Sequence, residues 1–346
     1  MKALLKTANI SEEYKIKEID NCIFIIDNRD KVVQFINKAN STTEKGRKYM
    51  SCWDFTTLYT KIPHDVLKSK IGKFISKVFA CLRTFKNPKE FICYSSSSNT
   101  TYYSKNRSKS NICFDRSELI KAVEYIIDHA YISFQNSIYR QIVGIPMGTN
   151  CAPFLANIYL HIFEYDYLSK LIEQGDIITA KQLSNMYRFQ DDCIALNDKE
   201  QFRYHYERMY KDSAMELKCT NLSRDKCNFL DLTISIYRGK FIYRSYDKRN
   251  DFDFDVVNYP NLHGNIPKGS SYGVYVSQLV RFVDININFN NFVNDVNKLT
   301  KTFIMQGFES SILKLKYVQF SNKYIHKWGK YGNKVDSSST INKIFH

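Results

Sequence analysis

The sequence predicts an α+β protein whose helices and strands do not follow a regular βαβ alternation. Short or alternating apolar segments, typical of strands, are mixed along the chain with longer segments whose apolar residues recur at helical spacing. Of the 346 residues, 44% are hydrophobic and 15% aromatic, which provides ample apolar surface for a folded core. A chain of this length favours about two packed units.

The charge balance points to a polyanionic partner. The chain has 50 Lys and Arg against 35 Asp and Glu, a net charge of +15, which makes nucleic acid the first candidate. Its apolar runs are far shorter than the roughly 20 residues that cross a bilayer, and the N-terminus lacks the apolar stretch of a signal peptide. Nine cysteines without a Cys-x-x-Cys pair argue against a disulfide framework or a zinc ribbon. We therefore expect a soluble intracellular protein with reduced cysteines.

Short elements are expected in the first part of the chain. Residues 24–27 predict an apolar strand, residues 32–36 a helical turn or two, and a further strand ends at Asp54. A helix begins near Pro63, a residue suited to the first turn. The apolar residues at helical spacing on one face of that helix are Leu67, Ile71, Phe74, Ile75, Val78 and Phe79.

The next segment differs in composition from its neighbours. Residues 84–113 are rich in Ser, Asn and Thr with scattered Lys and Arg, which predicts an inserted, mobile loop with short strands around Phe91 to Tyr94. Asp115 and Glu118 have the spacing of a capping box, so a helix follows. A second long helix is expected from about Cys151 to Leu171, with Asn150 as its N-cap.

The C-terminal half mixes strands with helices. Residues 186–196 predict two short strands with a polar pair between them, and residues 201–217 a polar surface helix. Residues 230–236 alternate as a half-buried strand that turns back into 241–246 as a hairpin. The last 70 residues favour helices, and residues 297–334 contain eight lysines against one acid, with seven aromatic residues interleaved.

Three acidic residues are candidates for metal-dependent chemistry. Asp54 ends a strand, and Asp191 and Asp192 are adjacent within an otherwise apolar hairpin. Two such carboxylates repel each other and are costly to desolvate, and a divalent cation removes that cost. Taken alone, an Asp-Asp pair is more often a solvated turn. Between the two acidic sites lies the loop 141–148, whose Gly and Pro residues would be an ordinary turn before a helix if they stood alone.

The order of these three segments resembles motifs A, B and C in the palm of a reverse transcriptase. Further details resemble the Penelope-like retroelement reverse transcriptases, the branch nearest telomerase. The residues that carry this resemblance are Leu58-Tyr59-Thr60-Lys61-Ile62-Pro63-His64, Met147-Gly148-Thr149-Asn150-Cys151-Ala152-Pro153, Phe229-Leu230-Asp231-Leu232, Tyr246-Asp247-Lys248-Arg249 and Tyr272-Gly273-Val274-Tyr275-Val276-Ser277-Gln278-Leu279.

The resemblance implies a right-hand polymerase fold. Partial fingers would occupy residues 1–48, in a chain truncated at its N-terminus, and a palm with an antiparallel sheet and helices would occupy 49–246. The inserted loop at 84–113 would belong to the palm, and 247–346 would form a helical, thumb-like region.

The resemblance also implies residue roles. Asp54 and Asp191 would bind metal, with Asp192 as the supporting acid, and Tyr59 would select deoxynucleotides by excluding the 2′-hydroxyl. Either Lys226 or Lys218 would act as general acid toward the leaving pyrophosphate. The residues expected to contact the nucleotide and template, besides Tyr59, are Gln141, Gly144, Pro146, Met147 and Gly148.

The expected activity is RNA-directed DNA polymerisation with Mg²⁺, or with Mn²⁺ in its place. Its partners would be an RNA template, a DNA primer and deoxynucleoside triphosphates. One alternative is an inactive retroelement remnant that binds nucleic acid, because the upstream Arg and Lys residues of the family are not found. A weaker alternative is an RNA-dependent RNA polymerase, which the bulky Tyr59 disfavours.

Overall fold

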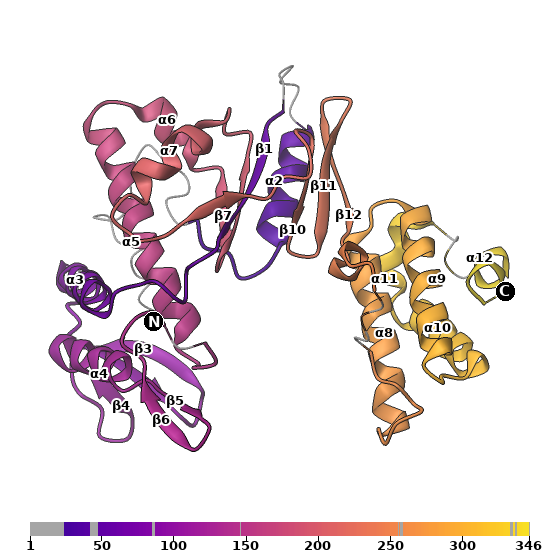
Figure 1. Ribbon diagram of the computed structural model, residues 1–346, viewed down its shortest axis with the longest axis horizontal. Helices are drawn as coiled ribbons and strands as arrows, with labels where there is room; N and C mark the ends of the chain where they lie inside the picture. The colour runs from indigo at the N-terminus through magenta and orange to yellow at the C-terminus, as the bar shows by residue number, and fades with distance from the viewer. Residues whose placement is uncertain are drawn as a thin grey trace. The chain divides into compact units, whose positions relative to one another are not determined.

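The computed structural model describes residues 24–41, 48–84, 87–145, 147–254, 256, 259–332, 335 and 338–345. The chain divides into two compact units (Figure 1). The first contains Met1–Phe35 and Lys45–Arg224, and the second contains Ile36–Glu44 and Asp225–His346. The first unit therefore ends at Arg224 and the second continues from Asp225, whereas the sequence predicts a palm–thumb boundary between residues 246 and 247. The assignment of these parts to fingers, palm and thumb stays a prediction, and most of the expected fingers segment lies outside the described residues.

A four-stranded antiparallel sheet is the centre of the first unit. Its strands are β1 (Met50–Phe55), β7 (Met186–Phe189), β8 (Asp192–Leu196) and β9 (Leu217–Cys219), in the order β7-β8-β1-β9. The strand predicted to end at Asp54 is β1, and the two predicted within 186–196 are β7 and β8. Because β1 is paired on both sides, the polar residue near its end has strand neighbours in two directions.

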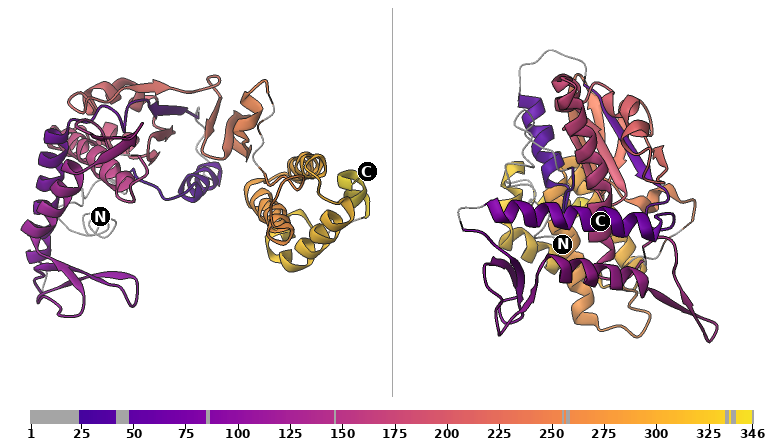
Figure 2. Two further views of the ribbon diagram at one scale, coloured as in Figure 1. Left: turned by 60° about the horizontal axis from the view of Figure 1, so that its bottom comes forward. Right: turned by 90° about the vertical axis from the view of Figure 1, so that its left-hand side faces the viewer.

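Helices α3 (His64–Thr84) and α5 (Ala152–Glu173) build the core of the first unit together with this sheet (Figure 2). All the apolar residues predicted for one face of α3 are buried. Helix α5 is buried around most of its circumference because α3, α6 (Ile177–Leu183) and α7 (Gln201–Met209) all pack against it. Its N-cap is Cys151 rather than Asn150, and this cap makes no side-chain hydrogen bond.

The helix predicted over 201–217 is too long. Helix α7 ends at Met209, Ala214 has a left-handed φ of 60°, and Leu217 already begins β9. The polar composition of this segment does not reveal that its end pairs with β1. Those hydrogen bonds satisfy backbone groups of β1, a long-range gain that outweighs local helix propensity.

Residues 84–113 confirm the short strand predicted around Phe91 to Tyr94, but they are folded as a sheet rather than as an open loop. They contain an antiparallel sheet of β2 (Phe91–Ser95), β3 (Thr100–Ser104) and β4 (Ile112–Phe114), in the order β3-β2-β4. Cys93 and Cys113 are opposite each other in β2 and β4 and form a disulfide, so the expectation of reduced cysteines is wrong for this pair. Their 20-residue separation and the odd cysteine count concealed the pairing. Tyr94 pairs with Thr101 and Ser95 with Thr100 across β2 and β3, and a composition typical of loops does not reveal such pairs.

The predicted capping box begins helix α4 (Arg116–Asp128). The Asp115 carboxylate accepts a hydrogen bond from the Glu118 amide at 2.9 Å, and the Asp115 amide donates to Glu118 Oε2 at 2.9 Å. The hairpin of β5 (Tyr131–Phe134) and β6 (Ser137–Arg140) follows α4, and the strand residues of this hairpin are exposed. This hairpin leads directly into the loop 141–148.

The second unit combines a three-stranded sheet with helices. Strands β10 (Lys226–Phe229), β11 (Leu232–Tyr237) and β12 (Lys240–Ser245) are antiparallel neighbours in that order, which confirms the hairpin predicted around 230–246. Asn40, from the end of α2 (Asp30–Ser41), pairs with the β12 backbone: its Nδ2 donates to the Phe241 carbonyl at 2.7 Å, and its Oδ1 accepts from the Phe241 amide at 2.9 Å.

Helices complete the second unit, as predicted for the last 70 residues. They are α8 (Lys268–Ile285), α9 (Phe289–Met305), α10 (Ser310–Lys323), α11 (Ile325–Trp328) and α12 (Ser338–Phe345), with short 3₁₀ segments at Lys248–Asp251 and Gly329–Tyr331. The aromatic residues of 297–334 are mostly buried in this helical core, and most of the lysines between them are exposed. Within the described part of the chain, no helix is both long enough and apolar enough to cross a membrane.

Candidate active site at the end of the central sheet

Pairing of β1 with β8 brings two of the three predicted carboxylates together. Asp54 is directly opposite Asp192 in the strand register. Opposed residues of an antiparallel pair have their Cβ atoms about 4.5–5.5 Å apart and on the same face of the sheet. On its other side Asp54 is opposite Lys218 of β9. Asp192, Asp54 and Lys218 thus form a row across three adjacent strands.

Asp191 lies in the tight turn that joins β7 to β8. Phe189 and Asp192 are paired, so Gln190 and Asp191 form a two-residue connection, and Gln190 has a left-handed φ of 55°. Two-residue hairpins require such a positive φ because their twist must match that of the strands. The Asp191 carbonyl accepts a hydrogen bond from the Phe55 amide at 3.0 Å, which ties the turn to the end of β1. Asp191 is therefore beside Phe55, and Asp192 is the residue opposite Asp54.

The loop 141–148 is attached to the segment that follows β1. The Gly144 amide donates to the Ile62 carbonyl at 2.8 Å, and the Ile145 amide donates to the Tyr59 carbonyl at 2.9 Å. His64 Nε2 donates to the Gly144 carbonyl at 2.8 Å. Two segments predicted to form one site, although about 80 residues apart, are thus neighbours in the structure.

Gly144 is required at this junction for two independent reasons. Its φ is +86°, and a Cβ there would lie 2.3 Å from the Tyr59 carbonyl oxygen. Gly148 has a φ of +97° but open space around it, so only its backbone conformation favours glycine. The side-chain amide of Gln141 donates to the Val143 carbonyl at 2.8 Å, whereas Met147 is 74% exposed. Pro146, also predicted to contact the nucleotide, lies outside the described residues.

The electrostatics of Tyr59 connect it with the Asp191 turn. Burial raises the pKa of the Tyr59 hydroxyl, the negative charge of Asp191 raises it further, and the positive charge of Arg188 lowers it. The Tyr59 ring is therefore within electrostatic reach of both residues, and its hydroxyl stays protonated at neutral pH. The predicted selectivity residue therefore interacts electrostatically with the predicted catalytic turn.

Sequence reasoning missed the buried polar group beneath that turn. The side chains of Arg188 and Glu164 are 0% exposed and form an ion pair, with 2.6 Å between Arg188 Nε and Glu164 Oε1. Asn157 and Tyr210 also bond to this pair. Arg188 stands in an apolar strand, and Glu164 in a helix that is apolar on nearly every side. A charged residue in such surroundings signals a buried partner, but the sequence does not say which one.

The donor set at the turn suits a hard divalent cation. Mg²⁺ prefers oxygen ligands and is typically held by one or two carboxylates together with substrate phosphates. Asp54 and Asp192 on one face, with Asp191 beside them, supply ligands of that kind. Among the residues that the structure describes, no three His, Cys, Asp or Glu side chains form a ready metal cage. A cation held here would therefore need ligands from substrate or water as well.

The two candidate general acids lie in different sheets. Lys218 is an exposed residue of β9, opposite Asp54. Lys226 belongs to β10 of the second unit, where it pairs with Ser235. The structure thus brings Lys218 into the row of acidic residues and leaves Lys226 in another sheet.

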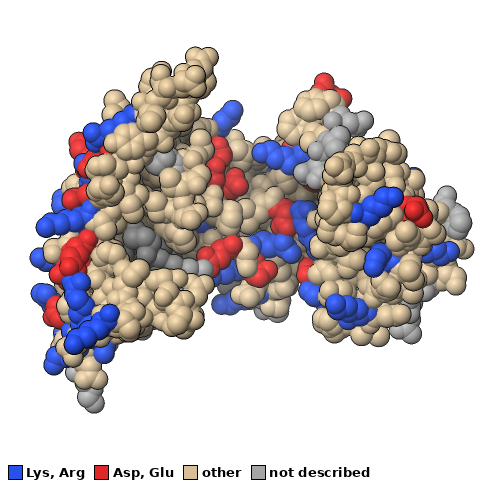
Figure 3. Space-filling model, turned by 90° about the horizontal axis from the view of Figure 1, so that it is seen from below, with Lys and Arg blue, Asp and Glu red and all other residues tan. Residues whose placement is uncertain are grey.

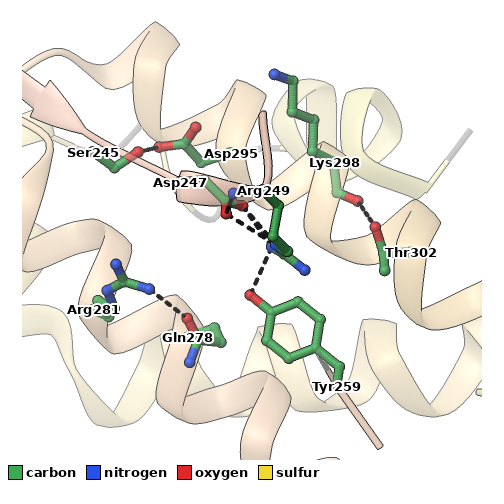
Figure 4. Close-up of polar contacts among 9 residues, drawn as sticks. All are labelled: Ser245, Asp247, Arg249, Tyr259, Gln278, Arg281, Asp295, Lys298 and Thr302. Atoms are coloured by element: carbon green, nitrogen blue, oxygen red, sulfur yellow. Dashed lines mark hydrogen bonds and ion pairs between the residues drawn. The ribbon is translucent and has the colours of Figure 1, made fainter. Parts of the chain in front are cut away.

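The second unit has a polar cluster of its own, built from two of the sequence segments noted above (Figure 4). Arg249 binds the Asp247 carboxylate through Nε at 2.9 and 3.0 Å, and its Nη2 donates to the Tyr259 hydroxyl at 3.1 Å. On α8, Arg281 donates to Gln278 and to Asp231 of the β10–β11 turn, both at 3.3 Å.

On the face that Figure 3 shows, Lys and Arg are spread among other residues rather than gathered in one continuous patch.

Comparison with solved structures identifies the fold. Telomerase from Candida albicans, solved with a TWJ fragment of telomeric RNA, has a TM-score of 0.58 at 11% identity, covering 99% of this chain and 54% of that chain. The chain has the fold of a telomerase-like polymerase. Telomerase from Candida tropicalis, solved with such an RNA fragment, has a TM-score of 0.47 at 11% identity, covering 99% of this chain and 52% of that chain. An RdRp complex has a TM-score of 0.44 at 11% identity, covering 84% of this chain and 23% of that chain.

The chain spans about half the length of the telomerase structures that it matches. No protein-family model matches it, and no curated protein sequence does so at a significant level.

Proposed function

We propose that this chain is an RNA-directed DNA polymerase of the Penelope-like reverse transcriptase group. The observation that carries the proposal is the pairing of Asp54 with Asp192 beside the Asp191 turn, at the end of the central sheet of a polymerase fold. The loop 141–148 and Tyr59 are attached to the same end of the sheet. Such an arrangement suits nucleotidyl transfer from a deoxynucleoside triphosphate to the 3′-hydroxyl of a DNA primer on an RNA template.

Each residue has a role in this proposal. Asp54 and Asp191 would hold Mg²⁺, or Mn²⁺ in its place, with Asp192 as supporting acid; bound there, the ions would stabilise charge on the attacking and leaving oxygens. Tyr59 would exclude the 2′-hydroxyl of a ribonucleotide by its bulk. The loop from Gln141 to Gly148 would support the incoming nucleotide and the template.

Lys218 is the better candidate for the general acid because it is opposite Asp54, whereas Lys226 is in another sheet. Alanine substitution distinguishes the two lysines. Only Lys218→Ala is expected to lower the maximal rate of extension, and a loss confined to Lys226→Ala would reverse the assignment.

Primer extension on an RNA template tests the proposal. The wild-type chain is expected to extend a DNA primer with Mg²⁺ or Mn²⁺, and Asp191→Asn is expected to lose this activity because a metal-binding carboxylate is removed. Asp166→Asn is the matched control: it removes an exposed carboxylate on α5, whose side chain is 51% exposed and forms only a 4.0 Å pair with Lys77.

Three outcomes would contradict this function. They are equal extension by wild type and Asp191→Asn, equal loss in the Asp166→Asn control, and no extension by a folded wild-type chain. In the last case, salt-dependent binding to an RNA–DNA duplex without turnover would identify the alternative, a nucleic-acid-binding remnant. A preference for ribonucleotides by the wild type would instead identify an RNA polymerase.

A further inference from the structure

Arg188 uses its whole guanidinium in the core of the first unit. Nε donates to Glu164 Oε1 at 2.6 Å, and Nη2 donates to Glu164 Oε2 and to the Asn157 carbonyl, both at 3.2 Å. Nη1 donates to Asn157 Oδ1 at 2.7 Å and to the Gln190 carbonyl at 3.1 Å. All five N–H donors of the guanidinium therefore have acceptors. Four of these bonds go to α5, and the fifth goes to the turn that carries Asp191.

The other partners of this group are also held in place. The Tyr210 hydroxyl donates to Glu164 Oε1 at 3.0 Å. The backbone of Arg188 is bonded on its outer side, where its amide donates to the Phe24 carbonyl at 2.7 Å and its carbonyl accepts from the Ile26 amide at 2.9 Å. Neither the strand nor the guanidinium can shift without breaking several hydrogen bonds.

Stability alone is a poor explanation for this arrangement. Apolar side chains of similar volume often replace a buried ion pair without loss of stability, because desolvating the charges offsets their attraction. No apolar side chain could donate to the Gln190 carbonyl. That carbonyl belongs to the left-handed residue immediately before Asp191, so its orientation determines where the next peptide and the Asp191 side chain point.

We propose that Arg188 is a positioning residue, which with Glu164 and Asn157 holds the Gln190–Asp191 turn in register with helix α5. Without this anchor the turn would keep its hairpin conformation but would shift relative to α5, and the Asp191 carboxylate would lose its fixed direction relative to Asp54 and Asp192. Helix α5 begins directly after the loop 141–148, so the clamp links the nucleotide-binding loop to the acidic turn. The catalytic consequence rests on the proposed polymerase function, whereas the structural clamp does not.

Amide hydrogen exchange tests the clamp without any substrate. In Arg188→Lys the charge remains, but lysine has a single ammonium in place of the planar fork that reaches both α5 and the turn. Exchange of the Phe55 amide, which donates to Asp191, and of the turn amides is expected to accelerate about tenfold, as for one lost hydrogen bond to a charged group. The amides of the β1–β8 pairs farther along the sheet, such as Ser51 and Ala195, are expected to keep their protection.

Tyr159→Phe is the matched control. Tyr159 lies on the same helix, is 0% exposed, and donates to the Ser213 carbonyl at 2.9 Å, away from the turn. The Tyr159→Phe substitution removes this buried hydrogen bond of α5 and leaves the contacts of Arg188 intact. This variant is expected to lose stability and yet keep the protection of the turn amides. If Arg188→Lys folds too poorly to measure, Asn157→Ala removes the 2.7 Å bond from Arg188 Nη1 to Asn157 Oδ1 and is expected to show the same local acceleration.

Kinetics then tests the catalytic consequence. Arg188→Lys is expected to lower the maximal extension rate and to raise the Mg²⁺ concentration for half-maximal activity by about tenfold, the factor that corresponds to one such hydrogen bond. Its KM for deoxynucleotide and its affinity for duplex are expected to stay unchanged. Tyr159→Phe is expected to alter none of these quantities.

The clamp is overturned if Arg188→Lys leaves turn exchange unchanged, or if exchange accelerates equally throughout the sheet or equally in Tyr159→Phe. If amide exchange in the turn accelerates in Arg188→Lys but the Mg²⁺ dependence of its activity is unchanged, the clamp exists and its catalytic role is overturned. A wild-type chain without polymerase activity would contradict the proposed function, and the exchange comparison would still decide whether the clamp exists.

Discussion

His161 is a neutral side chain in the interior of the first unit. It is 1% exposed, and its ring lies edge-on to Phe74 at 6.0 Å. Neither ring nitrogen has a hydrogen-bond partner among the residues that the structure describes. Burial lowers its pKa to about 4, although Glu164 opposes this shift. An unfolded histidine titrates near 6.5. Protonation therefore favours the unfolded chain as pH falls from about 6.5 toward 4.

We expect the free energy of unfolding to fall over that range by up to about 3 kcal/mol through His161 alone. His161→Leu is expected to abolish this part of the pH dependence, because leucine carries no titrating group. Urea unfolding at pH 7 and pH 4.5 measures the difference. His326→Leu, which changes an exposed histidine of the second unit, is the control, and an equal effect in both variants would contradict the assignment.

Tyr59 is the residue whose size is expected to decide which sugar is accepted. Tyr59→Ala is expected to raise the relative incorporation of ribonucleotides by about one to two orders of magnitude, because the 2′-hydroxyl no longer meets a ring. Single-nucleotide extension with deoxy- and ribonucleotides measures the ratio. Tyr59→Phe keeps the ring and is expected to keep the selectivity. Unchanged selectivity in Tyr59→Ala would remove Tyr59 from this role.

At the scale of elements, the junction between the β1–α3 connection and the loop 141–148 depends on one glycine. Gly144→Ala must adopt a left-handed conformation, which costs about 1–2 kcal/mol, and it must also move the Tyr59 carbonyl away from the new Cβ. Gly148→Ala has the same conformational cost and open space. We expect Gly144→Ala to be the more destabilising by about 1–3 kcal/mol in urea unfolding, the usual cost of overpacking. Equal losses would show that the contact relaxes freely.

Elements with strong local signals were predicted well. The capping box of α4, the apolar face of α3 and the hairpin of β11 and β12 follow from patterns within a few residues. The elements that were missed depend on distant partners. Strand β9 exists because β1 is next to it, and β3 and β4 exist because they pair with β2.

A hairpin turn with the pattern Phe-x-Asp occurs in both units, and its surroundings differ. Phe189 to Asp192 and Phe229 to Leu232 each form a two-residue hairpin whose second residue, Gln190 or Leu230, has a left-handed φ. In the second unit Asp231 pairs with Arg281. In the first unit the turn stands beside Asp54 and is bonded from below by Arg188. The local sequence predicts both hairpins, and only the neighbouring elements make one of them a candidate site.

At the scale of the whole molecule, the net charge of +15 predicts salt-dependent binding to a primer–template duplex. Each phosphate neutralised contributes a slope of about −0.9 to the plot of log affinity against log salt. Charge reversal of Lys298, Lys301 and Lys314, exposed lysines of α9 and α10, is expected to weaken binding and to reduce this slope by about one per contact. Fluorescence anisotropy at several salt concentrations measures it.

Charge reversal of Lys73, Lys77 and Lys121 on α3 and α4 is the control for net charge. If the two triple variants change the slope equally, binding follows total charge, and the helices of the second unit have no special part in it. A larger effect of the second-unit lysines would support the thumb-like role predicted for 247–346.

The sequence by itself predicted a polyanionic partner, the α+β class and the segments that could form a polymerase site, because charge, periodicity and motif order are properties of the linear chain. Only the tertiary structure decided that Asp192 is opposite Asp54, that Lys218 rather than Lys226 joins their row, and that Arg188 lies beneath the turn. Strand register and buried ion pairs arise from contacts between residues far apart in the chain. Their energies depend on which elements meet, and that information is absent from any local pattern.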